Sequence, residues 1–227
     1  WSKFMDIGGA GNNNGGGGGS TVEDIYNVQS DFTLSNIDVP HRVTASFSYE
    51  LPLAKKRALL GGWQMSGSAS WQSGTPVTVT ANGFGLSFAV RRPDRVDGVS
   101  AFIPRNEMQA NIRADRFAFN PDAYAQPADF TLGNAARNQN DTRRDSYKSF
   151  NISLLKSFRF FENRHRMQLR SEFLNAFNSV SFGTPGRDVN DRDIVQNGVI
   201  VRRGNFGRVR TQGNSPRIIQ LVLRYTF

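Results

Sequence analysis

The chain of 227 residues contains no cysteine and no apolar run of the roughly 18 residues that a transmembrane helix requires. The lack of such a run excludes a membrane-spanning helix on sequence grounds. The lack of cysteine does not fix the compartment, because cysteine-free chains are common both in the cytoplasm and outside it. The chain also opens with Trp1 and shows no signal peptide, so we expect it to be the C-terminal part of a longer protein.

Residues that carry catalytic or metal chemistry are scarce as well. The two histidines, His41 and His165, precede predicted strands on opposite rims, and we expect solvated or interfacial residues, not a catalytic pair. Asp188, Asp191 and Asp193 lie among arginines without the spacing of a calcium loop. The glycine run near the start lacks the Lys-Ser/Thr of a phosphate loop. We therefore expect no enzymatic activity, no cofactor and no metal site.

The formal charge of +9 is the strongest compositional bias. Such a charge can indicate a nucleic-acid partner, but the arginines are scattered and no basic helix or RNA-binding signature accompanies them. We therefore expect no nucleic-acid partner. The 22 glycines and 11% aromatic residues favour strands over helices. A soluble basic β-protein that binds polysaccharide or nucleic acid is kept as the least favoured alternative.

The last residues, 216–227, place apolar side chains at every second position, with Gln220, Arg224 and Thr226 among the residues of the other side. The apolar side ends on the final aromatic residue and consists of Ile219, Leu221, Leu223, Tyr225 and Phe227. A soluble edge strand could show the same alternation. An apolar face that ends on an aromatic residue resembles, however, the C-terminal strand that the assembly machinery of bacterial outer-membrane β-barrels recognises. We interpret these residues as an assembly signal.

Four further segments, 40–51, 63–80, 147–160 and 165–178, alternate in the same way. The charged residues of the polar side are Arg42, Glu50, Arg159, Arg166, Arg170, Glu172 and Arg224. We expect this side to face the lumen of a barrel, where its charges either contact a plug or substrate or balance one another. The aromatic residues Tyr49, Trp63, Trp71, Phe160 and Phe177 are expected at the membrane interfaces. Lys156 lies on the apolar side, so we place it near the periplasmic rim with its ammonium reaching water.

The connections between these segments alternate in length. Counted back from the C-terminus they are long (179–215), short (161–164), long (81–146), short (52–62) and long (6–39). This order is typical of an up-and-down membrane barrel with long extracellular loops and short periplasmic turns. The sequence therefore predicts an all-β fold, the C-terminal portion of a transmembrane antiparallel barrel with about five strands and a stub. Since the smallest such barrels have about eight strands, further strands must lie upstream.

Local signals subdivide the expected loops. Asn120-Pro121-Asp122 predicts a helical turn, since it combines a capping residue with Pro at the first helical position. Asn197-Gly198, between two short apolar runs, predicts a hairpin. Residues 1–5 are expected to be the end of a barrel strand, and the Gly/Asn tract at 6–20 a mobile loop.

A series of short motifs resembles, in order, the C-terminal barrel segment of TonB-dependent outer-membrane receptors, most closely the Oar-like branch with a carboxypeptidase-regulatory-like domain. The motifs are Trp1-Ser2-Lys3, Val39-Pro40-His41-Arg42, Ser73-Gly74-Thr75-Pro76, 119–124, Gly133-Asn134, Arg137-Asn138, 170–178, Asn205-Phe206-Gly207-Arg208 and Arg224-Tyr225-Thr226-Phe227. Each motif is short, and the resemblance depends on their order along nearly the whole chain.

The resemblance implies a barrel of about 22 strands that is closed by an N-terminal plug and receives energy through TonB. Its function would be the active uptake of a scarce nutrient such as a metal chelate, an oligosaccharide or a peptide. The implied partners are outer-membrane lipid and lipopolysaccharide, the plug and upstream strands of the same protein, the barrel-assembly machinery, and TonB through the N-terminal region. A passive porin or adhesin-type barrel is the main alternative.

Overall fold

The computed structural model describes residues 1–7, 23–24, 26–52, 61–81, 91–104, 107, 117–160 and 165–227. These residues divide into two units, each made of several chain segments. The sheet unit consists of Arg42–Gln72, Ser146–Ser181 and Gln212–Phe227, and the loop unit of Trp1–His41, Ser73–Asp145 and Phe182–Thr211. The predicted turn at 161–164 and most of the Gly/Asn tract lie outside the described residues.

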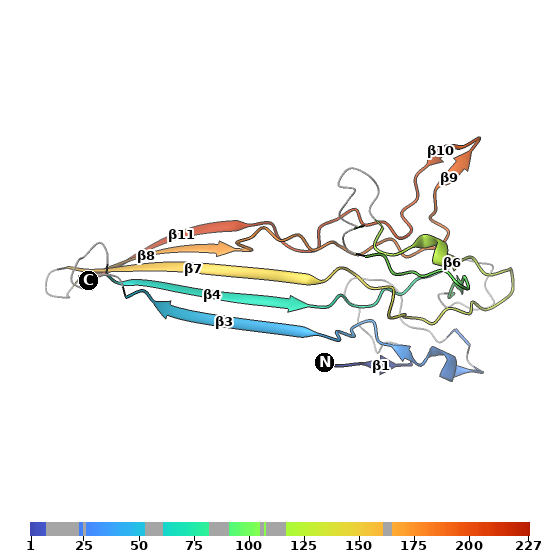
Figure 1. Ribbon diagram of the computed structural model, residues 1–227, viewed down its shortest axis with the longest axis horizontal. Helices are drawn as coiled ribbons and strands as arrows, with labels where there is room; N and C mark the ends of the chain where they lie inside the picture. The colour runs from blue at the N-terminus through green and yellow to red at the C-terminus, as the bar shows by residue number, and fades with distance from the viewer. Residues whose placement is uncertain are drawn as a thin grey trace. The chain divides into compact units, whose positions relative to one another are not determined.

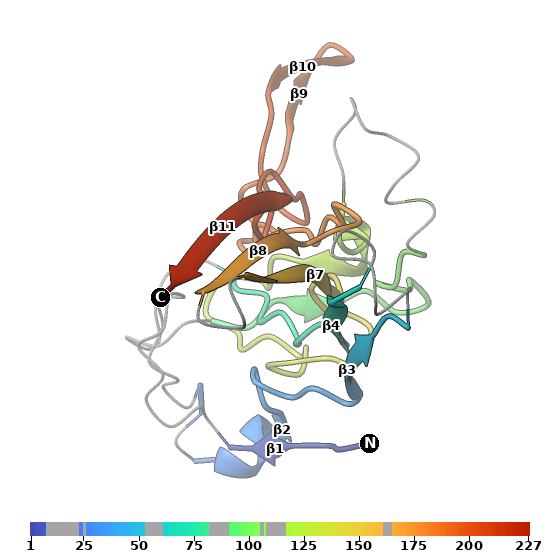
Figure 2. The same ribbon diagram turned by 90° about the vertical axis from the view of Figure 1, so that its left-hand side faces the viewer.

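The sheet unit is built on one 5-stranded antiparallel sheet. Its strands are β3 (Arg42–Glu50), β4 (Trp63–Gln72), β7 (Tyr147–Phe160), β8 (His165–Leu174) and β11 (Ile218–Thr226). Figure 1 shows them side by side in the order β11-β8-β7-β4-β3. The all-β class is therefore confirmed. The sheet is open, with β3 and β11 at its two edges, and Figure 2 shows that its strands form a curved row.

The pairing register keeps apolar residues opposite apolar ones across the sheet. On one face Phe47 pairs with Gly67, which pairs with Ile152. Ile152 pairs in turn with Phe173, and Phe173 with Ile219. A slip of one residue in any pair would move a whole strand's apolar set to the other face. The alternation thus excludes registers that are shifted by an odd number of residues, and the sheet has one mainly apolar and one mainly polar face.

The strand predicted at 63–80 is shorter in the structure, since β4 ends at Gln72. The chain then turns at Gly74, where an added Cβ would lie 1.8 Å from the Arg144 carbonyl oxygen. Val77 and Val79 continue the period of two, but they are 3% and 4% exposed and belong to the core of the loop unit. Alternation alone could not separate a sheet strand from this extended core segment.

The strand predicted at 165–178 also ends early, at Leu174. Asn175 stops it because its backbone is left-handed, with φ 49°, a conformation that Asn tolerates better than most residues. Its side chain then ties the chain together: Nδ2 donates to the carbonyls of Ser179 and Ser215, and Oδ1 accepts from the Ser179 N–H. The last strand differs from the predicted 216–227 only by its frayed ends.

The loop unit contains short paired strands and single turns. Its strands are β1 (Met5–Asp6), β2 (Thr33–Leu34), β5 (Asp94–Arg95), β6 (Tyr124–Ala125), β9 (Ile194–Gln196) and β10 (Val199–Arg202), and its 3-10 turns are η1 (Val28–Asp31) and η2 (Pro121–Ala123). The predicted turn at Pro121 is confirmed, with the Asn120 side chain accepting from the Asp122 N–H. The predicted hairpin at Asn197-Gly198 is confirmed as β9 and β10.

The expected barrel-strand stub at residues 1–5 is wrong. β1 pairs with β2 and not with the main sheet. The Ser2 N–H donates to the Pro40 carbonyl, which ties the start of the chain to the residues just before β3. The described part of the chain contains no helix that is long and apolar enough to cross a membrane.

The long connections are not structureless, because the loop unit has its own hydrophobic core. Phe119, Tyr124 and Phe206 are at most 3% exposed and pack edge to face, with ring centroids 5.4 to 6.3 Å apart. Ala101, Ala123 and Val189 are buried around them. Two segments far apart in the sequence, 117–125 and 205–208, thereby share one core.

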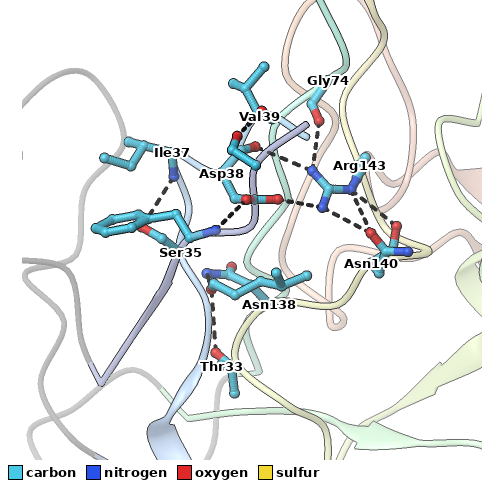
Figure 3. A network of polar contacts seen from close by, with 12 residues as sticks. Thr33, Ser35, Ile37, Asp38, Val39, Gly74, Asn138, Asn140 and Arg143 are labelled. Carbon is cyan, nitrogen blue, oxygen red and sulfur yellow. Dashed lines mark hydrogen bonds and ion pairs between the residues drawn. The ribbon is translucent and has the colours of Figure 1, made fainter. Parts of the chain in front are cut away.

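Arginine–carboxylate pairs hold the loop unit together in addition to this core. Asp38, which is 1% exposed, accepts from the Phe4 N–H and from Arg143 Nη2, both at 2.7 Å. Arg143 also donates to the Gly74 carbonyl and to Asn140, as Figure 3 shows. The remaining close pairs of this unit are Arg92–Glu23, Arg95–Asp141, Arg137–Asp6, Arg192–Asp122, Arg202–Asp191 and Arg208–Asp193. Many of the scattered arginines therefore form ion pairs within the loop unit.

Candidate functional site

The polar face of the sheet carries all the charged residues that the alternation predicts for a lumen. They come from β3, β7, β8 and β11, and by register they share one face of the sheet: Arg42, Glu50, Arg159, Arg166, Arg170, Glu172 and Arg224. Glu50, Arg159, Arg166, Arg170 and Arg224 lie toward the end of the strands where the short connections are, whereas Glu172 pairs with Ser153 nearer the middle of the face and Arg42 lies at the opposite end. Most of the charge on this face therefore lies toward one end, and Arg42 is the charged residue at the other end.

At the charged end arginines predominate. Arg159 pairs directly with Arg166 across β7 and β8, an arrangement that brings like charges together. Arg170 bonds Glu172 at 2.7 Å and donates to the Ser153 hydroxyl, so part of the expected charge balance exists. Within the described segments, no carboxylate lies within ion-pair distance of Arg159, Arg166 or Arg224. The charged end thus keeps a surplus of positive charge.

Between Arg42 and the charged end, the same face carries no charged residue on three neighbouring strands. This neutral block consists of Thr44, Ser46 and Ser48 on β3, Ser66, Ser68 and Ser70 on β4, and Ser149, Asn151 and Ser153 on β7. The Asn151 amide donates to the Ser68 hydroxyl at 3.2 Å, and Gln64 donates to Ser48 at 2.9 Å. Hydroxyl and amide groups of three neighbouring strands thus share one face of the sheet.

A cleft of about 580 Å³ adjoins the neutral block. It lies between the start of β7, the end of β8 and the chain that leads into β11, and all of these belong to the sheet unit. Its lining residues are Tyr147, Ser149, Asn151, Leu174, Asn175, Gln212, Gly213, Asn214, Ser215, Pro216 and Ile218. None of these lining residues is charged.

Two of the asparagines in the cleft wall hold the backbone in place. Asn175 bridges residues 179 and 215, as described above, and is 7% exposed. Asn214 accepts from the Ser181 N–H and donates to the Ser179 carbonyl. Because these side chains bond to main-chain groups, the wall between β8 and β11 is fixed without a ligand, and the more exposed lining residues can contact one.

On the apolar face, the aromatic residues predicted for the membrane interfaces fall into two groups. Tyr49, Trp63 and Phe160 lie at strand ends next to the short connections. Trp71 lies near the opposite end of β4, and the Phe177 ring is 4.8 Å from that of Phe150. Their position in a bilayer stays a prediction.

The environment of Lys156 differs from the prediction that its ammonium group reaches water. Its side chain is 1% exposed, and Nζ donates to the Gly61 carbonyl while lying 5.4 Å from the Trp63 ring centroid and 4.8 Å from that of Phe158. The ammonium therefore does not extend into water. Aromatic faces and a turn carbonyl stabilise the cation on the apolar side of the sheet.

The predicted assembly signal lies on β11, whose side chains are open to the surroundings. Ile219, Leu221, Leu223, Tyr225 and Phe227 are 57%, 73%, 65%, 56% and 90% exposed. The Tyr225 hydroxyl bonds His165 Nδ1 at 2.6 Å, and the Tyr225 ring lies 6.1 Å from the Phe227 ring. These residues thus form an apolar stripe on an edge strand, which is accessible to a partner.

The environment of several loop-unit groups shifts their ionisation. Burial raises the pKa of the Tyr124 hydroxyl, although the hydrogen bond with Thr142 opposes this effect. Burial lowers the pKa of Arg144, and the neighbouring charge of Arg187 acts in the same direction. The hydrogen bond from Arg208 lowers the pKa of Asp193 from 3.8 to about 2. Asp193 is therefore ionised at neutral pH and acts as a tie for Arg208, which is 6% exposed.

The Asp193–Arg208 pair should make the loop unit sensitive to acid. Since the folded pKa of Asp193 lies below its ordinary value, the pair stabilises the unit above pH 3.8, and this stabilisation is lost as the pH falls through about 2. Hydrogen exchange of the Gly204 amide, which donates to Asp193, should accelerate in this range relative to an Asp193→Asn variant at the same pH values. An acid response that is equal in the variant would contradict this prediction.

The loop-unit core and the cleft are the features that alternation did not reveal. The motifs around Phe119 and Phe206 were a signal for the core, because both motifs contribute buried rings to it. No comparable local signal marked the cleft, which depends on the left-handed turn at Asn175 and on three separate chain segments.

Comparison with known proteins gives one match that extends over nearly the whole chain. A family model described as an outer membrane beta barrel domain matches residues 1–220. No curated protein matches the sequence. No solved structure matches it either.

Proposed function

The chain belongs to the outer membrane beta barrel domain family and lies in the bacterial outer membrane, and from this premise we propose that it is the C-terminal part of a TonB-dependent receptor for active uptake. The soluble alternative is set aside, because the family is one of the outer membrane. In this role the chain forms part of the barrel wall. The plug and TonB contact belong to other parts of the protein.

The division of the sheet into two faces is the observation that carries the proposal. Across the pairs from β3 to β11 one face is apolar and the other is polar. A sheet in a bilayer needs this division, because one side contacts lipid and the other water or protein. The open edges of β3 and β11 require further strands, since unpaired backbone groups are costly in hydrocarbon. We propose that upstream strands of the same protein close the barrel.

The uptake function is supported by the ordered motifs that resemble TonB-dependent receptors and by the uneven polar face. A surplus of arginine at one end of the face offers contacts for an acidic plug segment or an anionic substrate. The apolar face would contact lipid and lipopolysaccharide acyl chains. The exposed stripe on β11 would contact the assembly machinery. No catalytic role is proposed.

Energy dependence distinguishes this proposal from a passive porin or an adhesin. The test first identifies compounds that the parent strain removes from its medium and that a strain without the full-length gene does not remove. A strain without TonB should also fail to remove these compounds. The purified full-length protein should show no steady conductance in planar lipid bilayers. Uptake that persists without TonB, together with a permanently open channel, would favour the porin. A gene deletion that changes cell adhesion and no uptake would favour the adhesin.

A further inference from the structure

The cleft beside the neutral block has a lining that selects among ligand classes. Its described lining residues offer hydroxyl groups, amides and exposed apolar surface, and they offer no charge. Tyr147 on β7 pairs with Gln72 on β4, and Gln72 pairs with Arg42 on β3, so Tyr147 is separated from the charge of Arg42 by one strand. The arginine surplus lies at the opposite end of the strands.

Charged ligands fit this cleft poorly. An ion that enters it loses part of its hydration, and no opposite charge in the wall compensates for this loss. The same reasoning disfavours peptides, which carry charged termini and often charged side chains. A metal chelate with carboxylate groups would meet the same penalty.

Purely apolar ligands also fit poorly. Such a ligand would cover hydroxyl and amide groups without replacing their hydrogen bonds to water, and each buried group without a partner costs about 1–3 kcal/mol. The Tyr147 and Ser215 hydroxyls make no hydrogen bond to any of the described residues, so they are open to a ligand.

A neutral molecule with many hydroxyl groups and an apolar ring face meets both conditions. The exposed groups of Tyr147, Gln212 and Ser215 can exchange hydrogen bonds with its hydroxyls. Tyr147, 39% exposed, and Leu174, 37% exposed, supply surface for its C–H groups. The neutral block continues the same hydroxyl and amide chemistry across β7, β4 and β3, so a chain of such units could remain in contact beyond the cleft.

We propose that this cleft binds a neutral saccharide and that the neutral block is the surface along which its further sugar units lie. The inference rests on the proposed function, because it makes the saccharide the substrate for uptake. It places recognition on residues of β7 and of the segment 212–218, and the side chains of Asn175 and Asn214 join that segment to residues 179–181.

Binding should be measured on the purified full-length protein in detergent by calorimetric titration. The probes are a mixed set of neutral plant and bacterial oligosaccharides, the same chains with a uronic acid in place of one sugar, and peptides of similar length. Neutral chains should bind more tightly than their acidic counterparts. Tyr147→Ala should weaken binding of the best neutral chain about tenfold, which corresponds to about 1.4 kcal/mol. Tyr147→Phe, which keeps the ring, should weaken it less.

Tyr26→Ala serves as the matched control, since this tyrosine is 94% exposed and belongs to the loop unit. It should bind like the parent protein. The outer-membrane level and heat-modified gel mobility of each variant show whether the barrel has formed. Equal binding by folded Tyr147→Ala, stronger binding of acidic chains, binding of peptides in place of saccharides, or no binding of the neutral set would each overturn the inference.

The two proposals can fail separately. If the saccharide inference alone is wrong, uptake still requires TonB and the neutral chains do not bind. If the uptake function is wrong, the neutral chains bind at Tyr147, but their removal from the medium does not depend on TonB.

Discussion

Deletion of Phe227 from the full-length protein should lower its level in the outer membrane about tenfold. Phe227 is 90% exposed at the end of the apolar stripe on β11, so its ring is available to the assembly machinery before insertion. Burial of a Phe side chain in a partner is worth about 1.5–3 kcal/mol, and a loss of 1.4 kcal/mol corresponds to a tenfold weaker complex. The level is measured by immunoblot after outer-membrane fractionation.

Phe102→Ala is the control for this deletion. Phe102 is also exposed, at 63%, but it lies in the loop unit and outside the stripe. Its outer-membrane level should match that of the parent protein. If both variants reach the membrane equally well, Phe227 is not part of an assembly signal, and the evidence for the barrel is unaffected.

Phe206→Ala should destabilise the loop unit by about 3–5 kcal/mol, the usual range for removing a buried aromatic ring. Phe206 is 2% exposed and contacts the rings of Phe119 and Tyr124, and the Arg192 guanidinium lies 5.1 Å from its ring centroid. The cavity left by the ring would remove partners from both aromatic residues and from the cation. No other described side chain has this set of contacts that could replace the lost ones. We therefore expect the loop unit to unfold locally around position 206.

Hydrogen exchange of the full-length protein measures this effect. The Ala118 amide, which donates to the Gly207 carbonyl, and the Phe206 amide, which donates to Asp191, lie at the core and should exchange much faster. The Phe102→Ala variant should leave both amides protected. Amides of the strands in the sheet unit should change little in either variant. Unchanged protection at Ala118 in Phe206→Ala would show that the rings do not hold this unit together.

The surplus of arginine and the neutral block give the two ends of the polar face different chemistry. A substrate held at the neutral end would meet little electrostatic attraction there, whereas the charged end would attract anionic groups. The scattered arginines of the loop unit take no part in this contrast, because many of them are paired with carboxylates.

The strand segments could be predicted from the sequence because a period of two is a local property. Apolar residues such as Phe47, Ile152 and Leu223 alternate with polar ones along their strands, and a slip of one residue in the pairing would move them to the other face. The ends of the strands were harder to predict from the sequence. Val77 and Val79 continue the same period, yet they pack in another unit, and burial is not a local property.

Most of the loop unit could not be predicted for the same reason. Phe119 and Phe206 have no periodic neighbours, and their contact joins segments that are separated by two strands of the sheet in the sequence. Asp38 and Arg143 form a buried pair across an even longer separation. Phe119 and Phe206 lie in two of the short motifs, but the motifs did not indicate that the two rings would meet.

The sequence by itself determined the all-β class, the pairing of successive strands, the two faces of the sheet and the local turns at Pro121 and Asn197, because each depends on side chains a few positions apart. The tertiary structure alone decided where β4 and β8 end, how the long connections share a core, that the Lys156 ammonium bonds a turn carbonyl, and that an uncharged cleft forms beside Tyr147. Each of these features depends on groups from distant segments that contact one another and exclude water. No local pattern in the sequence predicts such contacts.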